Sequence, residues 1–199
     1  MTTRSDLRAS LRVRLEDPTP APLWTDAVLH DFLRAALHRA SARFPRQMTE
    51  TLVATGGELV LPLAGPALER DIVRVHRPDG TVLRSSVPGD PTPGWSFWNG
   101  ALVLNTPAPA GSWRIDYLAL LELPDDDVTA IDLPAGDEEV VVLLAASGAL
   151  LRRSVEVGKR GQEASSLALV RVADAYERAA ESLIRARFRR VIGGVLHAR

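Results

Sequence analysis

The chain has 199 residues and a formal net charge of −1, with 46% hydrophobic and 25% charged residues. This balance is typical of a folded globular protein and excludes a disordered chain. The absence of cysteine excludes disulfide bonds and thiolate metal sites, and no apolar run is long enough to span a membrane. The first residues lack the apolar core of a signal peptide, and the absence of cysteine fits synthesis in a cytoplasm.

The charge is unevenly distributed along the chain. Residues 1–49 carry a net charge of +3, residues 50–137 carry −8, and residues 138–199 carry +4. An acidic middle between two basic ends indicates two surfaces with different partners, or an uneven spread of charge over solvated faces.

The first predicted element is a short amphipathic helix over residues 5–15. Leucines recur at every fourth position from Leu7 to Leu15, which gives one apolar stripe. Thr3 and Asp6 have the spacing of a capped helix start. Three prolines between residues 18 and 22 then prevent the helix from continuing.

A second helix is predicted from Thr25 to Phe44. Thr25 is a suitable N-cap, Asp26 complements the helix dipole in the first turn, and Pro45 ends the helix. The expected buried face consists of Leu29, Leu33, Ala36, Leu37, Ala40 and Phe44.

From Glu50 to about Leu123 the hydrophobic period changes from 3.6 to 2, which predicts antiparallel strands. Asn99-Gly100 and Pro78-Asp79-Gly80 each lie between two apolar runs and are strong hairpin signals. The candidate strands are residues 50–54, 58–63, 71–76, 81–87, 95–98, 101–104 and 113–120.

Two more helices are predicted after this region. The third spans Asp137 to Val155, and its middle, Val140–Ala146, is apolar all round, as in a central buried helix. A break at Gly158–Gly161 separates it from a fourth helix over residues 162–191, with Gly193-Gly194 as its C-cap. The fourth helix is too long for the short first helix to cover, so part of it is expected to contact another subunit or to project outward.

These elements predict an α+β protein: a mostly helical four-helix bundle with an antiparallel β lobe inserted between the second and third helices. We expect residues 1–49 to form the N-terminal helical hairpin of the bundle and residues 50–124 to form the lobe. Residues 125–199 would supply the helices that complete the bundle, with a docking tail at 191–199.

No set of nucleophile, base and acid is found, and we expect no enzyme, no cofactor and no metal. No serine lies in a G-x-S-x-G motif. His30 and His38 are two helical turns apart and fit surface positions better than a zinc site. Residues 158–161 lack the spacing of a phosphate-binding loop, and Asp125–Asp127 fits a solvated acidic loop.

Four aromatic residues of the β region allow two interpretations. Trp95 and Phe97 share a strand face while Trp98 points the other way, and Trp113 lies on a later strand. The rings could form a sugar-binding platform, or they could fill the core of the lobe or contact a neighbouring subunit.

Basic and apolar residues alternate at the C-terminal end. The apolar members would fill a groove on a protein partner while the arginines pair with its carboxylates, or the arginines would contact DNA phosphates without reading sequence. The predicted partner-binding residues are Arg185, Arg187, Phe188, Arg189, Arg190, Val191, Ile192, Val195, Leu196 and Arg199.

Several short motifs occur in a characteristic order. They are Leu7-Arg8-x-x-Leu11 before a proline-rich loop, Trp24-Thr25-Asp26 leading to Leu29, Phe32 and Leu33, the strand Trp113–Tyr117 leading to Leu123–Asp126, and Ile131-Asp132-Leu133-Pro134 before the third helix. With these motifs the chain resembles, over nearly its full length, the head–tail connector (adaptor) proteins of tailed bacteriophages and gene transfer agents. The order of the elements is more specific than any single motif.

The resemblance implies a structural protein of the virion neck. Such proteins form a ring, commonly a dodecamer, that joins the portal to the tail and continues the DNA channel. The implied partners are other copies of the chain, the portal protein, downstream stopper and tail proteins, and passing DNA, but no membrane. The C-terminal set would dock on the portal. The alternative is a carbohydrate- or protein-binding β module on a helical stalk, which a row of exposed coplanar rings at Trp95 and Trp98 would favour.

Overall fold

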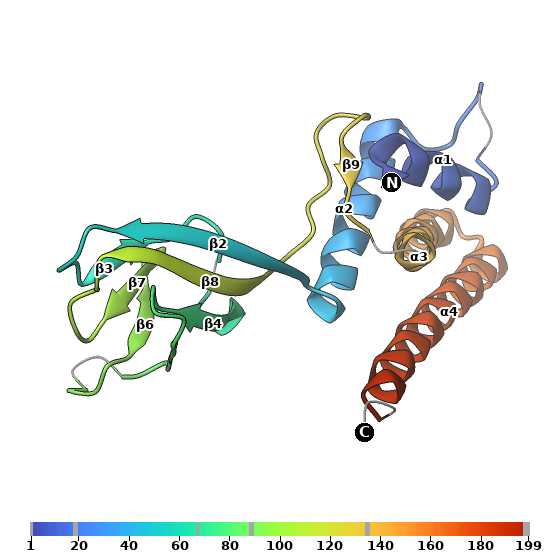
Figure 1. Ribbon diagram of the computed structural model, residues 1–199. Coiled ribbons are helices and arrows are strands. Elements are labelled where there is room, and N and C mark those ends of the chain that lie inside the picture. The colour runs from blue at the N-terminus through green and yellow to red at the C-terminus, as the bar shows by residue number, and fades with distance from the viewer. Residues whose placement is uncertain (1, 18–19, 67, 88–89, 134–135, 197–199) are drawn as a thin grey trace. The chain divides into compact units, whose positions relative to one another are not determined.

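The computed structural model describes residues 2–17, 20–66, 68–87, 90–133 and 136–196, and it describes side chains as far as Ala186. Within these residues the fold is α+β, with four α-helices and antiparallel sheets. The chain divides into two compact units (Figure 1). Unit 1 comprises Met1–Phe44 and Leu121–Arg199, and unit 2 comprises Pro45–Leu120.

Unit 1 begins with helices α1 (Arg4–Arg14) and α2 (Asp26–Arg43). The predicted capping of α1 is confirmed, because the Thr3 hydroxyl accepts the Asp6 amide at 3.2 Å and the Asp6 carboxylate accepts the Thr3 amide at 2.9 Å. Such a box satisfies two backbone donors that a helix start leaves free. The predicted N-cap of α2 is also found at Thr25.

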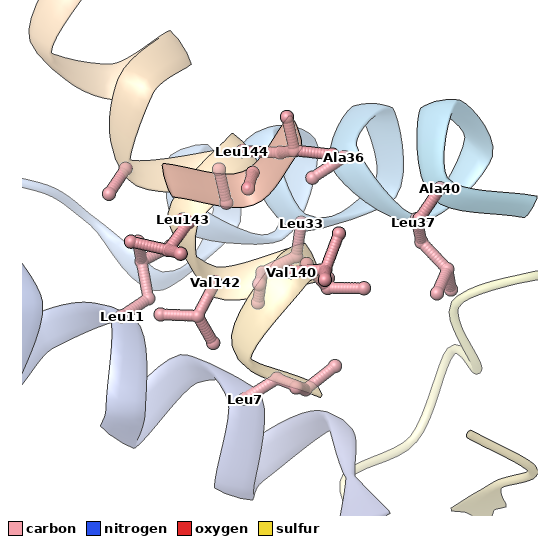
Figure 2. Close-up of a cluster of buried hydrophobic side chains, with 14 of the residues drawn as sticks. Leu7, Leu11, Leu33, Ala36, Leu37, Ala40, Val140, Val142, Leu143 and Leu144 are labelled. Carbon is pink, nitrogen blue, oxygen red and sulfur yellow. The ribbon is translucent and has the colours of Figure 1, made fainter. Parts of the chain in front are cut away.

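Helix α3 (Asp137–Lys159) is the centre of unit 1, since α1, α2 and α4 (Glu163–Leu196) all pack against it. Every side chain from Val140 to Ala146 is at most 4% exposed, which confirms the predicted central helix. Figure 2 shows the leucines of α1 and α2 meeting this segment. Apolar burial of this kind supplies most of the folding free energy of a small domain.

Both C-terminal helices extend beyond their predicted ends. Helix α3 includes Gly158, where a Cβ atom would lie 3.3 Å from the hydroxyl oxygen of Ser166, so glycine allows the two helices to approach closely. Its C-cap is Arg160, and the turn that follows uses Gly161 at a φ of 76°. The predicted C-cap at Gly193-Gly194 is wrong, because α4 continues to Leu196. A glycine costs about 1 kcal/mol in a helix interior, which is too little to end one.

A pairing that the sequence did not indicate ties the N-terminus to the segment before α3. Strand β1 (Thr2–Thr3) pairs antiparallel with β9 (Ala130–Ile131). Two residues are too short to show an alternating pattern, so the sequence carries no signal for this pair.

Unit 2 contains two sheets. One has the strand order β2-β8-β4-β5 and the other β3-β7-β6, with a 3-10 turn at Glu69–Asp71. The strands are β2 (Arg46–Ala54), β3 (Val60–Pro62), β4 (Ile72–His76), β5 (Val82–Leu83), β6 (Trp95–Trp98), β7 (Ala101–Leu104) and β8 (Gly111–Ala119). The longest pairing, between β2 and β8, runs without interruption from Arg46↔Ala119 to Ala54↔Gly111.

Both predicted hairpin turns are present in unit 2. Asn99 and Gly100 have φ angles of 49° and 72°, as the tight turn between β6 and β7 requires. Gly80 has a φ of 82° in the turn between β4 and β5. The two sheets share an apolar core whose most buried members are Val75, Leu102, Trp113 and Ile115.

Candidate assembly surfaces

The part of the chain that the structure describes shows no metal site. It contains no group of three or more histidine, cysteine, aspartate or glutamate side chains that could hold a metal ion. None of the helices, as far as the structure describes them, is both long and apolar enough to cross a membrane. The features described below are surfaces and side-chain clusters that could contact other macromolecules or hold such a surface in place.

A cluster of charged side chains joins α1 to the loop before β9. The Asp127 carboxylate accepts hydrogen bonds from Arg4 Nε at 2.7 Å and from Arg8 Nη2 at 3.0 Å. Arg4 also donates a hydrogen bond to the carbonyl of Pro124 at 3.0 Å. The hydrogen bonds from Arg8 and Arg4 lower the pKa of Asp127 to about 2. This clamp holds the loop in a fixed place on α1.

His30 of α2 belongs to the same cluster. Its Nε2 lies 2.8 Å from Arg8 Nη1, so a neutral imidazole accepts a hydrogen bond from the guanidinium. Burial, followed by the nearby charges of Arg4 and Arg8, lowers the pKa of His30 below its ordinary value. The residue is a structural acceptor here and has no metal-binding neighbours among the described residues.

The three aspartates predicted to form a solvated acidic loop have different roles. Asp127 is held in the clamp, whereas Asp126 accepts the backbone amides of Val128 at 2.8 Å and Thr129 at 2.6 Å. Asp125 is exposed. The segment 121–132 contains five carboxylates and no lysine or arginine, and Val128 is 83% exposed at its tip.

Arg12 forms a second polar hub that sequence reasoning missed. Its guanidinium lies 2.6 Å from Asp17 and 2.5 Å from Asp26, and it also donates to the carbonyl of Trp24 at 3.1 Å. The Asp17 side chain is only 2% exposed. Arginine and acids at these spacings are common on surfaces, so nothing in the sequence marked this group as buried.

The aromatic residues of unit 2 divide into core and surface. Trp95 and Trp113 are 5% and 1% exposed, and their indole N–H groups donate to the carbonyls of Leu83 and Pro109. Trp98 is 77% exposed. A row of exposed coplanar rings at Trp95 and Trp98 is therefore not formed, because Trp95 is in the core.

Trp98 nevertheless borders a groove on unit 2. The groove has a volume of about 630 Å³. Its lining consists of Glu69, Ser85, Ser86, Val87, Ser96, Phe97, Trp98 and Val103. Val87 is 76% exposed, so the groove offers two large uncovered apolar side chains.

Helix α4 has an inner and an outer face. On the inner face Ala173, Ala180 and Ile184 are at most 3% exposed. Tyr176 is partly buried, and its hydroxyl group donates a hydrogen bond to the carbonyl of Arg14 at the end of α1. Exposed apolar side chains of the same helix include Leu167, Val172 and Leu183.

The predicted C-terminal binding residues from Arg185 to Leu196 lie at the far end of α4, and Arg199 lies outside the described residues. Arg185 is exposed. The other members of the set fall outside the residues whose side chains the structure describes, namely Arg187, Phe188, Arg189, Arg190, Val191, Ile192, Val195, Leu196 and Arg199. Their role remains a prediction.

Comparison with known proteins identifies the family. No curated protein matches the chain. A family model described as SU10 adaptor protein matches residues 2–197, which is nearly the whole chain and confirms the resemblance seen in the sequence. The chain therefore belongs to the SU10 adaptor protein family.

Proposed function

We propose that the protein is a structural component of the virion neck, where copies form a ring that joins the portal to the tail and continues the DNA channel. The family match over residues 2–197 is the observation that carries this proposal. In it, unit 1 acts as a four-helix bundle and unit 2 as a lobe inserted between α2 and α3. The protein acts by contact and not by catalysis.

The distribution of uncovered apolar side chains supports a role in assembly. Val13 and Val128 of unit 1 are 80% and 83% exposed, and Val53 and Trp98 of unit 2 are 79% and 77% exposed. Single exposed apolar residues are ordinary on a soluble protein. Their presence on both units, together with the apolar outer face of α4, suits a subunit that has several neighbours.

The portal contact is assigned to the C-terminal end of α4. The last fifteen residues of the sequence combine five arginines, at 185, 187, 189, 190 and 199, with apolar residues such as Phe188 and Ile192. Arginine forms two-pronged hydrogen bonds with carboxylates, which suits an acidic groove on a protein. The same arginines could instead contact the phosphates of DNA of any sequence as it passes, because phosphate contacts carry no sequence information.

The groove beside Trp98 supports the alternative, a carbohydrate- or protein-binding β module carried on a helical stalk. An exposed tryptophan in a groove is a frequent centre of binding energy at protein interfaces. Under this alternative, Trp98→Ala would abolish function while particles still assemble. Under the neck proposal, particle assembly depends on unit 1 as well, whatever unit 2 contacts.

Deleting the gene in a particle-producing strain tests the proposal. We expect filled heads that carry a portal and lack tails, and we expect complete particles when the chain is supplied from a plasmid. Normal tailed particles from the deletion strain would contradict the proposal. If the purified protein had peptidase, glycosidase or nucleotidase activity that a single substitution abolished, the proposal that it acts without catalysis would be wrong.

A further inference from the structure

We infer that neighbouring copies contact each other through two different surfaces of unit 1, so that the tip of the acidic loop on one copy meets the outer face of α4 on the next. The acidic tip comprises Asp125, Asp126 and Val128. The outer face of α4 comprises a row of arginines and the apolar row beside it. This inference rests on the proposed function, because it names the contact that would close the ring.

The acidic tip is rigidly presented. Asp126 accepts the amides of Val128 and Thr129, which fixes the turn, and Asp127 is clamped by Arg4 and Arg8. Just beyond the tip, the pairing of β9 with β1 holds the chain. An exposed valine on a loop fixed on both sides loses little conformational entropy on binding, which favours a specific contact.

The outer face of α4 has the spacing of a helix-packing seam. Exposed residues recur at alternating intervals of four and three, as in a heptad pattern. The apolar row consists of Ala168, Val172, Ala175, Ala179 and Ala186, with the small polar Ser182 at the one remaining position, and all six are exposed. Since α3 covers the opposite side of the helix, this row has no partner among the described residues of unit 1.

A row of three arginines borders this seam. Arg171, Arg178 and Arg185 are exposed and seven residues apart, so they lie along one line of the helix. None of them forms a salt bridge with a side chain that the structure describes, whereas Glu177 and Glu181 are paired with Arg39 and Arg43. A groove of about 600 Å³ runs along this side of α4. Its lining consists of Glu177, Arg178, Glu181, Ser182, Arg185 and Ala186.

The charges select the partner surface. If two α4 helices paired through their seams in antiparallel fashion, one arginine row would face the other, and a parallel pair would place arginines against Leu169, Tyr176 and Leu183. Neither arrangement places a carboxylate directly opposite the arginine row. The acidic tip does, because Asp125 and its neighbours carry negative charge beside an exposed valine.

The two surfaces lie apart on unit 1. The loop is clamped to Arg4 and Arg8 in the first half of α1, whereas α4 contacts Arg14 at the end of the same helix. Figure 1 shows the loop before β9 and the red end of α4 on different sides of α2 and α3. A contact between two different surfaces repeats from copy to copy and closes into a ring when the rotation allows.

Cysteine cross-linking tests the contact directly, because the chain has no native cysteine. Particles assembled with a Val128→Cys/Ala175→Cys chain are oxidised and analysed on a non-reducing gel. We expect a ladder of covalently linked copies, since a disulfide forms only when the two Cα atoms are within about 7 Å. The matched control is Val53→Cys/Ala175→Cys, because Val53 is 79% exposed on unit 2, against 83% for Val128. The control should give no ladder.

Mixing the single variants shows that the contact joins different surfaces. Purified Val128→Cys and Ala175→Cys chains should each stay unlinked alone at high concentration and give linked dimers on mixing. Linking of Ala175→Cys with itself would overturn the inference in favour of paired α4 helices. Complete particles that contain the chain but give no ladder would also overturn it and would leave the proposed function intact. Absence of the chain from particles would instead contradict the proposed function.

Charge reversal gives a second, independent readout. Replacing Arg171 and Arg178 by glutamate should lower the yield of complete particles by at least about tenfold, the effect of roughly 1.4 kcal/mol on one contact. Replacing Asp125 of the acidic tip and Glu122, an exposed carboxylate of the same loop, by arginine should lower the yield similarly, and combining the two sets should restore most of it. Circular dichroism confirms that each variant is folded. Failure of the combination to recover any yield would contradict the inferred pairing.

Discussion

Arg4 Nε lies 2.7 Å from Oδ1 of Asp127, which joins the first helix to a loop 123 positions later in the chain. This contact fixes the chain segment that leads from β8 into the central helix α3. Because it is formed by charged groups near the surface, its strength depends on pH and on salt.

The clamp predicts a defined response to acid. The pKa of Asp127 is lowered to about 2, below its ordinary value of 3.8. A carboxyl group with a lowered pKa stabilises the fold above its ordinary pKa and loses that contribution as the pH falls toward the folded value. Asp127→Asn should therefore lower the melting temperature at pH 7, and the difference from the native chain should shrink between about pH 4 and pH 2. An unchanged difference across this range would contradict the clamp.

The environment of His30 leads to a second prediction about how the stability of the fold depends on pH. Burial lowers the pKa of His30 below 6.5, so the neutral form is favoured in the folded protein. Its contribution to stability is present above pH 6.5 and is lost as the pH falls through the folded pKa. The charged groups that face it are Arg4 and Arg8 of α1, Asp127 of the loop, and Asp26 of α2.

NMR titration of the imidazole measures this effect. We expect the His30 signal to titrate below pH 6.5. His30→Gln keeps an acceptor for Arg8 and should flatten the fall in stability between pH 7 and pH 5, whereas the control His38→Gln, at an exposed position of α2, should not. A His30 pKa above 6.5 would show that the nearby carboxylates outweigh burial and the two arginines.

The central position of α3 predicts a contrast between two leucines on the same helix. Leu143 is 3% exposed and Leu151 is 39% exposed. Leu143→Ala should lower the free energy of unfolding by about 2–5 kcal/mol, through lost burial and a residual cavity. Leu151→Ala should change it by much less, as exposed positions commonly do. Urea denaturation measures both, and equal losses would contradict the placement of the core.

Removal of residues 191–199 separates docking from folding. The buried residues of α4 end at Ile184 within the described part of the chain, so the truncated protein should keep its melting temperature within a few degrees. Filled heads should then fail to acquire tails, because the proposed portal contact is missing. A stop codon that removes only Ala198 and Arg199 provides the control. Complete infectious or transducing particles from the longer truncation would contradict the docking proposal.

Sequence reasoning predicted the helices and hairpins because their signals are local. The leucine stripe of α1, the apolar centre of α3 and the Asn99-Gly100 turn each depend on residues within a few positions of one another. The β1–β9 pair and the Arg12 hub escaped prediction because they depend on contacts between distant or patternless residues. The end of α4 was predicted too early, because Gly193-Gly194 was taken as a helix end, whereas the helix continues through both glycines to Leu196.

The candidate site was predicted less completely than the fold. The C-terminal arginines were predicted as a binding site because they lie close together in the sequence. The row of Arg171, Arg178 and Arg185 was not predicted, because its members are seven residues apart. The exposure of Val128 could not be read from its neighbours, because this loop has no hydrophobic periodicity that separates exposed from buried positions. Its position becomes evident only from the clamp that holds the loop.

Cryo-electron microscopy of purified particles tests the central claim most directly. The neck of wild-type particles should contain a ring of density between portal and tail into which units 1 and 2 of this chain fit. Particles made with a chain that carries a small added domain at its N-terminus should show extra density at that ring alone. Density for the chain elsewhere in the particle, or a neck ring that persists when the gene is deleted, would contradict the account.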